Sequence, residues 1–575
     1  KKDGELIAEK AVPLEVRQNL ISQNITDPAG LDLFSPPPKY EVEVKILRGT
    51  ILARETAAKV VGIEEAKDIF ISPFDSDQFD RYGGYRGIKG KKTGFFHVEK
   101  IGDRYWFITP EGNAFWSLSI NVLMMLEHWS APHVEFCKDR YGDDYGFAKY
   151  NVPRAKALGF NSAGFWTTPE IRQQMQAYDF PYFINLGLMG RSETYQLKDK
   201  DGNSLTARGL NAVVDPFNPQ WRQRVLDATA NLDSQDPYLI GYFIDNEIGI
   251  MWSSHHLYDF FYSPYTFSVF VEMLQKKYKT IENLNMAWSS KYHQYNYTSF
   301  SQIKQDPPQV RGDDDPVVPD LVAMERRIIQ ELVEFPIAAI RRVDPNHLIV
   351  GLRFAGTFYP EYMDLFSSYD VNSINIYNGP YRSQLDSFFY YRPKLIAQLT
   401  GKPVIITEFS FKADDSGLPN DKGAICKVET QEERAKGYAA VLSALAGQSY
   451  VIGAHYFSWQ DSETSERSNY GIVNWQEKMY RPLAETMRQL NPHIYQLTTQ
   501  NQDPAEPLAL LFTQEEGRTT WRDGKVPYFM NYTYQKEADS DTWLYVGNPY
   551  IKALARDTEF QHLLARPKTI FSFTD

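Results

Sequence analysis

The chain has 575 residues, and its 43% apolar and 23% charged content is typical of one large globular domain with accessory segments. Its net charge of −12 argues against nucleic acid or an anionic membrane surface as the main partner. No apolar run approaches the roughly 20 residues of a membrane-spanning helix, so we expect no membrane span.

The first hundred residues form a β-rich region. From Tyr40 to Ile46, apolar residues alternate with charged ones, which is the period-2 pattern of a half-exposed strand. Gly102-Asp103 lies between two further strand-like runs and predicts a hairpin turn. We therefore expect a separate β-rich module at the N-terminus.

From Phe115 onward, apolar runs alternate with amphipathic helical stretches, which is the pattern of repeated βα units. Eight runs qualify as strands, the number that a closed (β/α)8 barrel, or TIM barrel, requires. The fold class is therefore α/β. The predicted strands are residues 115–122, 160–166, 182–188, 238–244, 348–354, 371–377, 404–407 and 451–459.

Several helix boundaries are predicted by local chemistry. Asn218 followed by Pro219 places a capping side chain before a proline at the first helical position. Thr430 and Glu433 have the spacing of a capping box. Pro336 lies inside the helical stretch before the fifth strand, so we expect a kink or a break there.

The predicted domain organisation has three parts. Residues 1–100 form the N-terminal β-rich module, residues 101–500 the barrel, and residues 501–575 a C-terminal extension. The fourth and fifth strands are separated by about a hundred residues, far more than a barrel loop needs. We therefore expect a helical insertion at about residues 251–335.

Glu247 and Glu408 carry the chemistry. Each follows an apolar run that predicts a buried strand, and the carboxyl ends of barrel strands share one mouth. Hydrolysis of a glycosidic bond needs two such carboxylates, one to protonate the leaving oxygen and one to attack or stabilise the sugar cation. The structural alternatives are a helix-capping role for Glu247 and an arginine-paired strand end for Glu408.

Polar residues near this pair are candidate substrate-binding groups. Asn246 can hydrogen-bond a sugar 2-hydroxyl, a contact that strengthens in the transition state. Arg353 on the fifth strand and Tyr377 at the end of the sixth can keep a buried Glu408 ionised. Packed or rim positions are the alternative for both.

The end of the eighth strand supplies further candidates. Trp459 offers a flat face to a sugar ring, and His455 either contacts sugar or is a buried, hydrogen-bonded histidine. Asp461 follows them in the same segment. Trp166, after the second strand, is a weaker candidate because a tryptophan near a strand is more often part of the core.

Asn246-Glu247 after strand four and Glu408 after strand seven resemble glycoside hydrolase clan A, the retaining barrel glycosidases. Within that clan the chain most resembles the β-agarases of glycoside hydrolase family 50, over roughly residues 95–495. Residues 278–288 are also similar to a segment of barrel β-galactosidases. Residues 104–112, 243–247, 407–409 and 455–457 resemble the family's barrel entry, acid/base strand, nucleophile strand and eighth strand.

This resemblance implies a retaining β-glycoside hydrolase that acts on a red-algal galactan such as agarose or its oligosaccharides. Glu247 would be the acid/base and Glu408 the nucleophile, with a covalent glycosyl-enzyme and carboxyl groups about 5–5.5 Å apart. The N-terminal module would be β-sandwich-like, of carbohydrate-binding type.

The chain departs from the family pattern just after the nucleophile, where a histidine and a glycine-rich turn are replaced by residues 410–414, and again at the end of strand eight. A sulfated galactan of porphyran or carrageenan type is therefore an alternative substrate, with Lys412 and Arg467 as candidate sulfate contacts. A β-galactosidase would use the same barrel on a different sugar. A catalytically inactive barrel that only binds carbohydrate is the rival from a different functional class.

Other chemistries lack support in the sequence. It has no Gly-x-Ser-x-Gly elbow, phosphate loop or His-Glu-x-x-His motif. Cys137 and Cys426 are too few for a disulfide framework and are not spaced as metal ligands. We expect no metal or organic cofactor, and a polysaccharide or oligosaccharide as the partner. Endo or exo action and the oligomeric state stay open.

The first residues, Lys1-Lys2-Asp3, include neither a starting methionine nor an apolar leader. A trimmed chain that has lost a signal peptide is compatible with this start. A secreted or periplasmic location is therefore the expectation.

Overall fold

A computed structural model describes residues 32–500 with short gaps, and two strands beyond them. The gaps are residues 38, 49–50, 61–62, 64–65, 200, 206–211, 249–261, 292, 309–314, 356–359, 378–387 and 425. Beyond residue 500, only residues 534–536 and 543–545 are described, so most of the predicted C-terminal extension lies outside the described residues.

The centre of the molecule is a parallel sheet whose two ends are joined by one stretch of chain. The segments β11 (Leu348–Ile349) and β12 (Phe354–Ala355) lie at opposite ends of the strand order, yet they are consecutive pieces of the predicted fifth strand. β11 pairs with β10 (Leu239–Phe243), and β12 pairs with β13 (Asn372–Asn375). The fifth strand therefore closes the sheet into the predicted TIM barrel.

The remaining barrel strands each overlap a predicted run, and all neighbouring pairs are parallel. Every residue of the seventh and eighth strands is buried, as expected for strands enclosed between an inner core and an outer layer of helices. These strands are β7 (Ser117–Ile120), β8 (Ser162–Ala163), β9 (Tyr182–Asn185), β14 (Val404–Phe409) and β17 (Val451–Tyr456).

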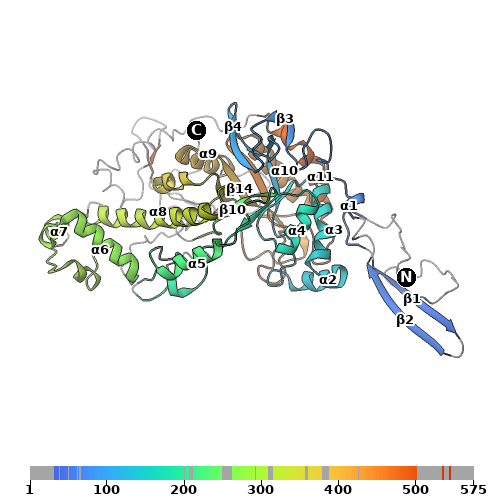
Figure 1. Cartoon of the computed structure of the whole chain (residues 1–575), viewed down its shortest axis with the longest axis horizontal. Coiled ribbons are helices and arrows are strands. Elements are labelled where there is room, and N and C mark those ends of the chain that lie inside the picture. The colour runs from blue at the N-terminus through green and yellow to red at the C-terminus, as the bar shows by residue number, and fades with distance from the viewer. Residues whose placement is uncertain are drawn as a thin grey trace.

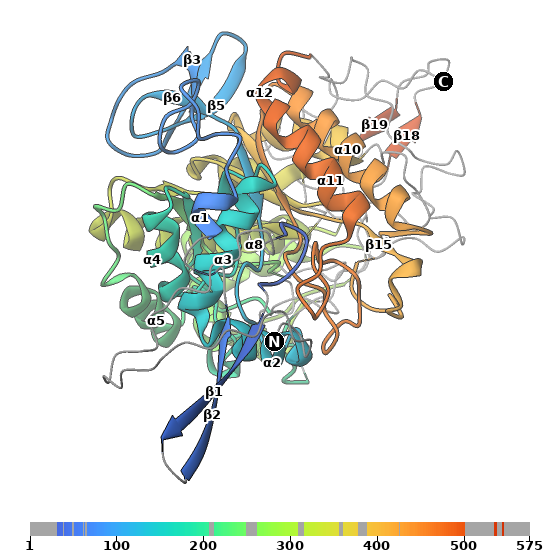
Figure 2. The same cartoon turned by 90° about the vertical axis from the view of Figure 1, so that its right-hand side faces the viewer.

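Helical segments follow each strand and form the outer layer (Figures 1 and 2). Asn218 caps α5 with proline at its first position, and the Thr430 hydroxyl accepts from the backbone N–H of Glu433 at the start of α10, so both predicted N-termini are confirmed. In order from strand one, the helices are α2 (Ala131–Tyr141), α3 (Asp144–Ala157), α4 (Pro169–Ala177), α5 (Pro219–Thr229), α8 (Val318–Val343), the 3₁₀ segment η6 (Pro360–Ser368), α9 (Phe388–Thr400), α10 (Gln431–Gly447), α11 (Arg481–Leu490) and α12 (Ile494–Leu497).

Of the kink or break predicted at Pro336, the break does not occur, because α8 continues through it to Val343, and the kink stays a prediction. The missing hydrogen bond is compensated by packing, since Leu332 and Val333 before the proline and Ala339 and Ile340 after it are all buried. Figure 1 shows α8 reaching out from the barrel toward α6 (Pro264–Tyr278) and α7 (Ile281–Trp288), which lie within the predicted insertion.

A four-stranded antiparallel sheet covers the end of the barrel opposite the carboxyl ends of its strands. Tyr105 of this sheet donates its backbone N–H to Ser449, just before the eighth strand, and the ring of Phe95 packs on His347, just before the fifth. The predicted hairpin turn at Gly102 joins two of its strands. The sheet consists of β3 (Tyr85–Lys89), β4 (His97–Ile101), β5 (Arg104–Ile108) and β6 (Asn113–Phe115), in the order β3-β6-β5-β4.

Two antiparallel hairpins lie toward the ends of the chain. β1 (Lys39–Arg48) pairs antiparallel with β2 (Ile51–Val60), which confirms the strand predicted at Tyr40 to Ile46, and this hairpin projects from the body in both views (Figures 1 and 2). Near the C-terminus, β18 (Tyr534–Lys536) pairs with β19 (Trp543–Tyr545). The division of the chain at residues 100 and 500 stays a prediction.

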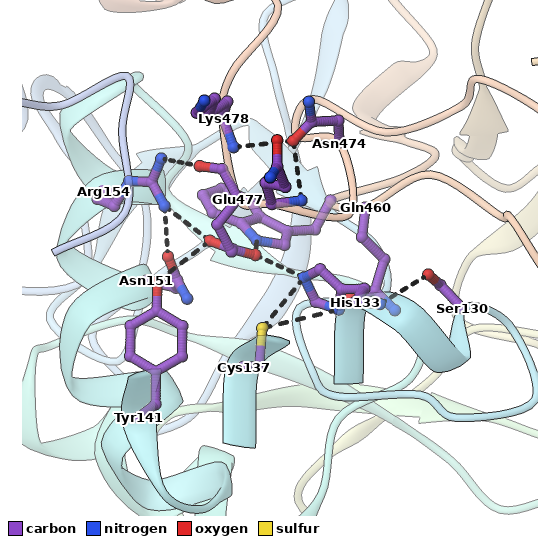
Figure 3. A network of polar contacts seen from close by, with 12 residues as sticks. Ser130, His133, Cys137, Tyr141, Asn151, Arg154, Gln460, Asn474, Glu477 and Lys478 are labelled. Atoms are coloured by element: carbon purple, nitrogen blue, oxygen red, sulfur yellow. Dashed lines mark hydrogen bonds and ion pairs between the residues drawn. The ribbon is translucent and has the colours of Figure 1, made fainter. Parts of the chain in front are cut away.

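A buried polar network ties the loop after strand eight to helices α2 and α3 (Figure 3). Glu477 accepts from Arg154 at 2.7 Å, and its other carboxylate oxygen lies 2.6 Å from Nε2 of His133. All three side chains are fully buried. Burial alone would raise the pKa of Glu477, but the hydrogen bond from His133 and the charge of Arg154 hold it below its usual range.

The same part of the molecule holds an N-terminal strap, residues 32–37. Its carbonyl oxygens accept hydrogen bonds from barrel side chains, with Arg154 donating to Leu33, Tyr150 to Ser35 and Arg140 to Pro37. The backbone N–H of Met479 donates to Phe34 from the loop after strand eight. The strap is therefore held through its backbone.

Candidate active site

Glu247 lies just beyond the end of β10, at the carboxyl-terminal mouth of the barrel. Its backbone φ of 51° is in the left-handed region, which is uncommon for a residue with a side chain. The Asn375 side-chain amide, at the end of β13, donates to its Oε1 at 2.8 Å. Thr407 donates to Oδ1 of Asn375, which orients the NH₂ group of that amide toward Glu247.

Glu408 belongs to β14 and is nearly fully buried. Arg353 donates to its Oε1 at 2.6 Å, and the Tyr377 hydroxyl donates to its Oε2 at 2.5 Å. Two charge-assisted hydrogen bonds fix both carboxylate oxygens in place. The predicted partnership of Glu408 with Arg353 and Tyr377 is present in the structure.

Arg353 links the two halves of the site. It lies between β11 and β12, where the fifth strand leaves the sheet, with a φ of 52°. One terminal nitrogen donates to Asn246 at 2.6 Å, and the other donates both to Glu408 and to the Thr407 carbonyl. Its guanidinium carbon lies 3.9 Å from the ring centroid of Phe165, a cation–π geometry.

Left-handed backbone recurs around the mouth. Val122, Trp166, Glu247 and Arg353 have φ between 51° and 62°, and they follow or interrupt strands one, two, four and five. Such conformations cost on the order of 1 kcal/mol or more each and cluster at functional sites. The energy of the surrounding core therefore holds four strand ends in uncommon backbone conformations.

The two glutamates differ in environment. Burial, and then the charge of Glu408, raise the pKa of Glu247 to about 7, while the hydrogen bond from Asn375 and the charge of Arg353 oppose this rise. Burial and the charge of Glu408 also raise the pKa of Tyr377 well above its ordinary value, so that its hydroxyl stays a donor. Near neutral pH the site can hold a proton on Glu247 opposite an arginine-paired Glu408.

An aromatic wall borders the site. The rings of Trp129 and Tyr470 stack with centroids 6.1 Å apart, and Phe457 packs edge-on against both of them. Trp166 is partly exposed and packs on Phe457 and toward Arg353. Trp129, Phe457 and Tyr470 are buried and support Trp166, whose partly exposed face suits a sugar ring.

The structure places three predicted contacts elsewhere. His455 is fully buried inside the barrel between the rings of Phe183 and Phe243. Trp459 is fully buried and donates to Glu477 of the network shown in Figure 3. Asp461 is also buried. The structure therefore gives these three the roles of core residues, and their contact with substrate stays a prediction.

Asp461 shows why the sequence could not separate these roles. Its carboxylate accepts from the Asn469 amide, the Gly471 backbone and the Tyr480 hydroxyl, so it organises the loop after strand eight. Burial raises its pKa to about 7. It follows a strand in the same way as the catalytic candidates, but its partners come from its own loop.

Sequence reasoning missed Asn375, Thr407 and Glu466. Asn375 ends the sixth strand, two residues before the predicted Tyr377, so its position was a usable signal. Thr407 directly precedes Glu408 and was available in the same way. Glu466 lies in the loop after strand eight, and nothing in its local sequence distinguishes it from a solvent-facing acid.

One cluster of potential metal ligands occurs among the described residues, at His133, Cys137 and Glu477, whose ligand atoms lie within 4.8 Å of one another. Glu477 is already bonded to Arg154, His133 and Trp459, and the guanidinium beside it disfavours a second cation. The hydrogen bonds therefore account for this cluster, and the absence of a cofactor stays an expectation.

Comparison with known proteins identifies the family. A glycoside hydrolase family model described as beta-galactosidase matches residues 196–493, just over half of the chain. The chain belongs to this family of glycoside hydrolases. It is 25% identical over 504 residues to beta-agarase B of Vibrio sp. (strain JT0107), and 24% identical over 392 residues to beta-agarase A of the same organism.

Solved structures agree on the fold. An agarase superposes with a TM-score of 0.61 at 22% identity, covering 77% of this chain and 72% of the other. An exo-beta-agarase superposes with a TM-score of 0.62 at 20% identity, covering 77% and 71%. The predicted resemblance to clan A and to the family 50 β-agarases is confirmed.

The match to beta-agarase B covers 72% of this chain and 50% of that protein. The match to beta-agarase A covers 62% of this chain and 37% of that protein, so the chain spans half or less of the length of these relatives. Across the described residues, the helices are all too short or too polar to cross a membrane.

Proposed function

We propose that this chain is a retaining β-glycoside hydrolase of an agarose-type galactan or its oligosaccharides. The observation that supports this most is the difference between the surroundings of the two glutamates. Arg353 and Tyr377 donate to both oxygens of Glu408, while burial raises the pKa of Glu247 to about 7. Two carboxyl groups whose environments separate their protonation states are what an acid and a nucleophile require.

In the proposed mechanism, protonated Glu247 gives its proton to the glycosidic oxygen as the bond to the anomeric carbon breaks. The Glu408 carboxylate attacks that carbon from the opposite face and forms a covalent glycosyl-enzyme. Glu247, now ionised, takes a proton from water, which hydrolyses the ester with net retention of configuration. Asn246, fixed by Arg353, is placed to bind the 2-hydroxyl of the reacting sugar.

The substrate proposal rests on the relatives, because beta-agarases are the curated proteins it matches and agarases are among its structural neighbours. An extended algal polysaccharide is encountered outside the cytoplasm, so we also propose a secreted or periplasmic location. The family model's description keeps β-galactosidase activity as the second candidate.

The test is release of reducing ends from agarose tetra- and hexasaccharides by the parent, Glu408→Ala and Glu429→Gln. Glu429 is an exposed glutamate in the loop after the same strand, and serves as a matched control. We expect the parent and the control to turn over, and Glu408→Ala to lose roughly 10³-fold or more. Proton NMR of the first product should show the β-anomer.

An initial α-anomer would exclude retention. Turnover of a β-galactoside with none of agarose would favour the galactosidase alternative. Binding of the oligosaccharides without turnover, unchanged in Glu408→Gln, would support the inactive barrel.

A further inference from the structure

A third carboxylate, Glu466, borders the site on the loop after strand eight. It is partly buried, and its backbone N–H donates to Ser462, whose hydroxyl donates to the Trp129 carbonyl. The loop that carries Glu466 is therefore fixed against the aromatic wall.

The Glu466 carboxylate and the Tyr470 hydroxyl both lie close to Gly423. A methyl group built on Gly423 would clash with Oε2 of Glu466 and with the Tyr470 hydroxyl, so only glycine leaves room for both. Tyr470 hydrogen-bonds Glu466, and its own oxygen accepts from the backbone N–H of Ala424 at 2.7 Å.

Tyr470 connects this carboxylate to the catalytic pair. Its ring centroid lies 6.5 Å from that of Tyr377, whose hydroxyl donates to Glu408. The groups also interact electrostatically. Burial is the main cause that raises the pKa of Glu466, and the charge of Glu408 adds to it, while the charge of Glu466 in turn contributes to the raised pKa of Glu247. Glu466 is therefore linked to Glu408 through two neighbouring tyrosines, Tyr470 and Tyr377.

The charges of Lys412 and Lys422 oppose the rise in the pKa of Glu466, and several cations in this region also bond to the protein itself. Lys412 is buried and donates to the Lys422 carbonyl at 2.7 Å, and Arg467 pairs with Asp421. Arg353 is occupied by Glu408, Asn246 and Thr407. The sequence suggests Lys412 and Arg467 as sulfate contacts. In the structure their hydrogen bond and ion pair stabilise the loops that hold Glu466.

We propose that Glu466 makes the mouth selective for uncharged galactan, by accepting a hydrogen bond from a sugar hydroxyl and by repelling a sugar that carries a sulfate ester at the same place. This inference rests on the proposed galactan hydrolysis and specifies its substrate class. Rejection of a wrong ligand by a like charge is a common source of specificity.

The experiment compares kcat/KM for agarose hexasaccharides with kcat/KM for porphyran oligosaccharides of the same length, which carry sulfate esters. The parent, Glu466→Gln, Glu466→Asp and the control Glu429→Gln are measured at low and high salt. We expect the parent to prefer the neutral substrate at least tenfold. Glu466→Gln should reduce that preference at least fivefold, whereas Glu466→Asp and Glu429→Gln should retain it.

Salt supplies a readout that does not depend on folding of the variants. If the preference is electrostatic, raising the salt concentration should weaken it in the parent, because screening acts on charges at an open mouth. An unchanged preference in well-folded Glu466→Gln, or a parent preference for the sulfated substrate, would overturn the inference while leaving galactan hydrolysis intact. A parent that cleaves neither substrate would instead overturn the proposed function.

Discussion

Asn375 sets the pH at which Glu247 gives up its proton. Its amide donates to the Glu247 carboxylate and so lowers the pKa of that glutamate against the opposing effect of burial. We expect Asn375→Ala to move the alkaline limb of the kcat/KM profile to higher pH, because the ionised form of Glu247 loses a donor. A pH–rate profile measures this, and a limb that stays in place or moves to lower pH would contradict it.

Arg353 is a residue at which even a conservative substitution should lower kcat/KM strongly. Its planar fork reaches Asn246 with one nitrogen and Glu408 with the other, and a single ammonium group cannot hold both. We expect Arg353→Lys to lower kcat/KM by about 10²-fold or more, with the exposed Arg481→Lys as the matched control. Equal losses in both variants would show that the fork itself is unimportant.

At the scale of elements, helix α3 and the loop after strand eight depend on one buried ion pair. Arg154→Met would leave Glu477 buried without its cation, which typically costs about 3–5 kcal/mol. Thermal unfolding should show this loss, and the exposed Arg342→Met should unfold like the parent. Adding Glu477→Gln to Arg154→Met should recover part of the stability, since the stranded charge is then removed.

Elements with a strong periodic or capping signal were predictable. The eight barrel strands, the hairpin at Gly102 and the N-termini of α5 and α10 follow from patterns within a few neighbouring residues. The continuation of α8 through Pro336 depends instead on tertiary packing that no local pattern contains.

The same limit applies to the site. Glu247, Glu408, Asn246, Arg353 and Tyr377 come together because barrel topology places strand ends at one mouth. His455, Trp459 and Asp461 carry the same signal, but they are buried among core residues or within their own loop. The register of the barrel decides whether a side chain near a strand end faces the mouth or the interior, and the sequence does not show that register. Glu466 reaches the site through loop folding, which its sequence does not specify.

At the scale of the whole molecule, the raised pKa of Glu247 is a cost to folding. The folded carboxyl keeps its proton up to about pH 7, whereas in the unfolded chain it ionises near 4.5. The folded state therefore loses stability as the pH rises from about 4.5 to 7, and the loss is complete above that range. Catalytic readiness is thus obtained at the expense of stability.

Glu247→Gln should remove this cost. We expect the variant to be as stable as the parent at pH 4 and more stable at pH 8, by a free energy on the order of 3 kcal/mol. Unfolding curves at the two pH values measure the difference. A variant less stable than the parent at pH 8 would show that the Glu247 carboxylate contributes favourable contacts that outweigh its burial.

The strap at residues 32–37 has a consequence for protein engineering. Arg140, Tyr150 and Arg154 bind it by its carbonyl oxygens, which every amino acid possesses. Side chains add to these backbone contacts, since Asp32 pairs with Arg481, Leu33 packs against the core, and the Phe34 ring lies under the Arg481 guanidinium. Hydrogen bonds to backbone carbonyl oxygens do not depend on residue type. The strap is therefore a suitable position at which another module can be fused to the same barrel.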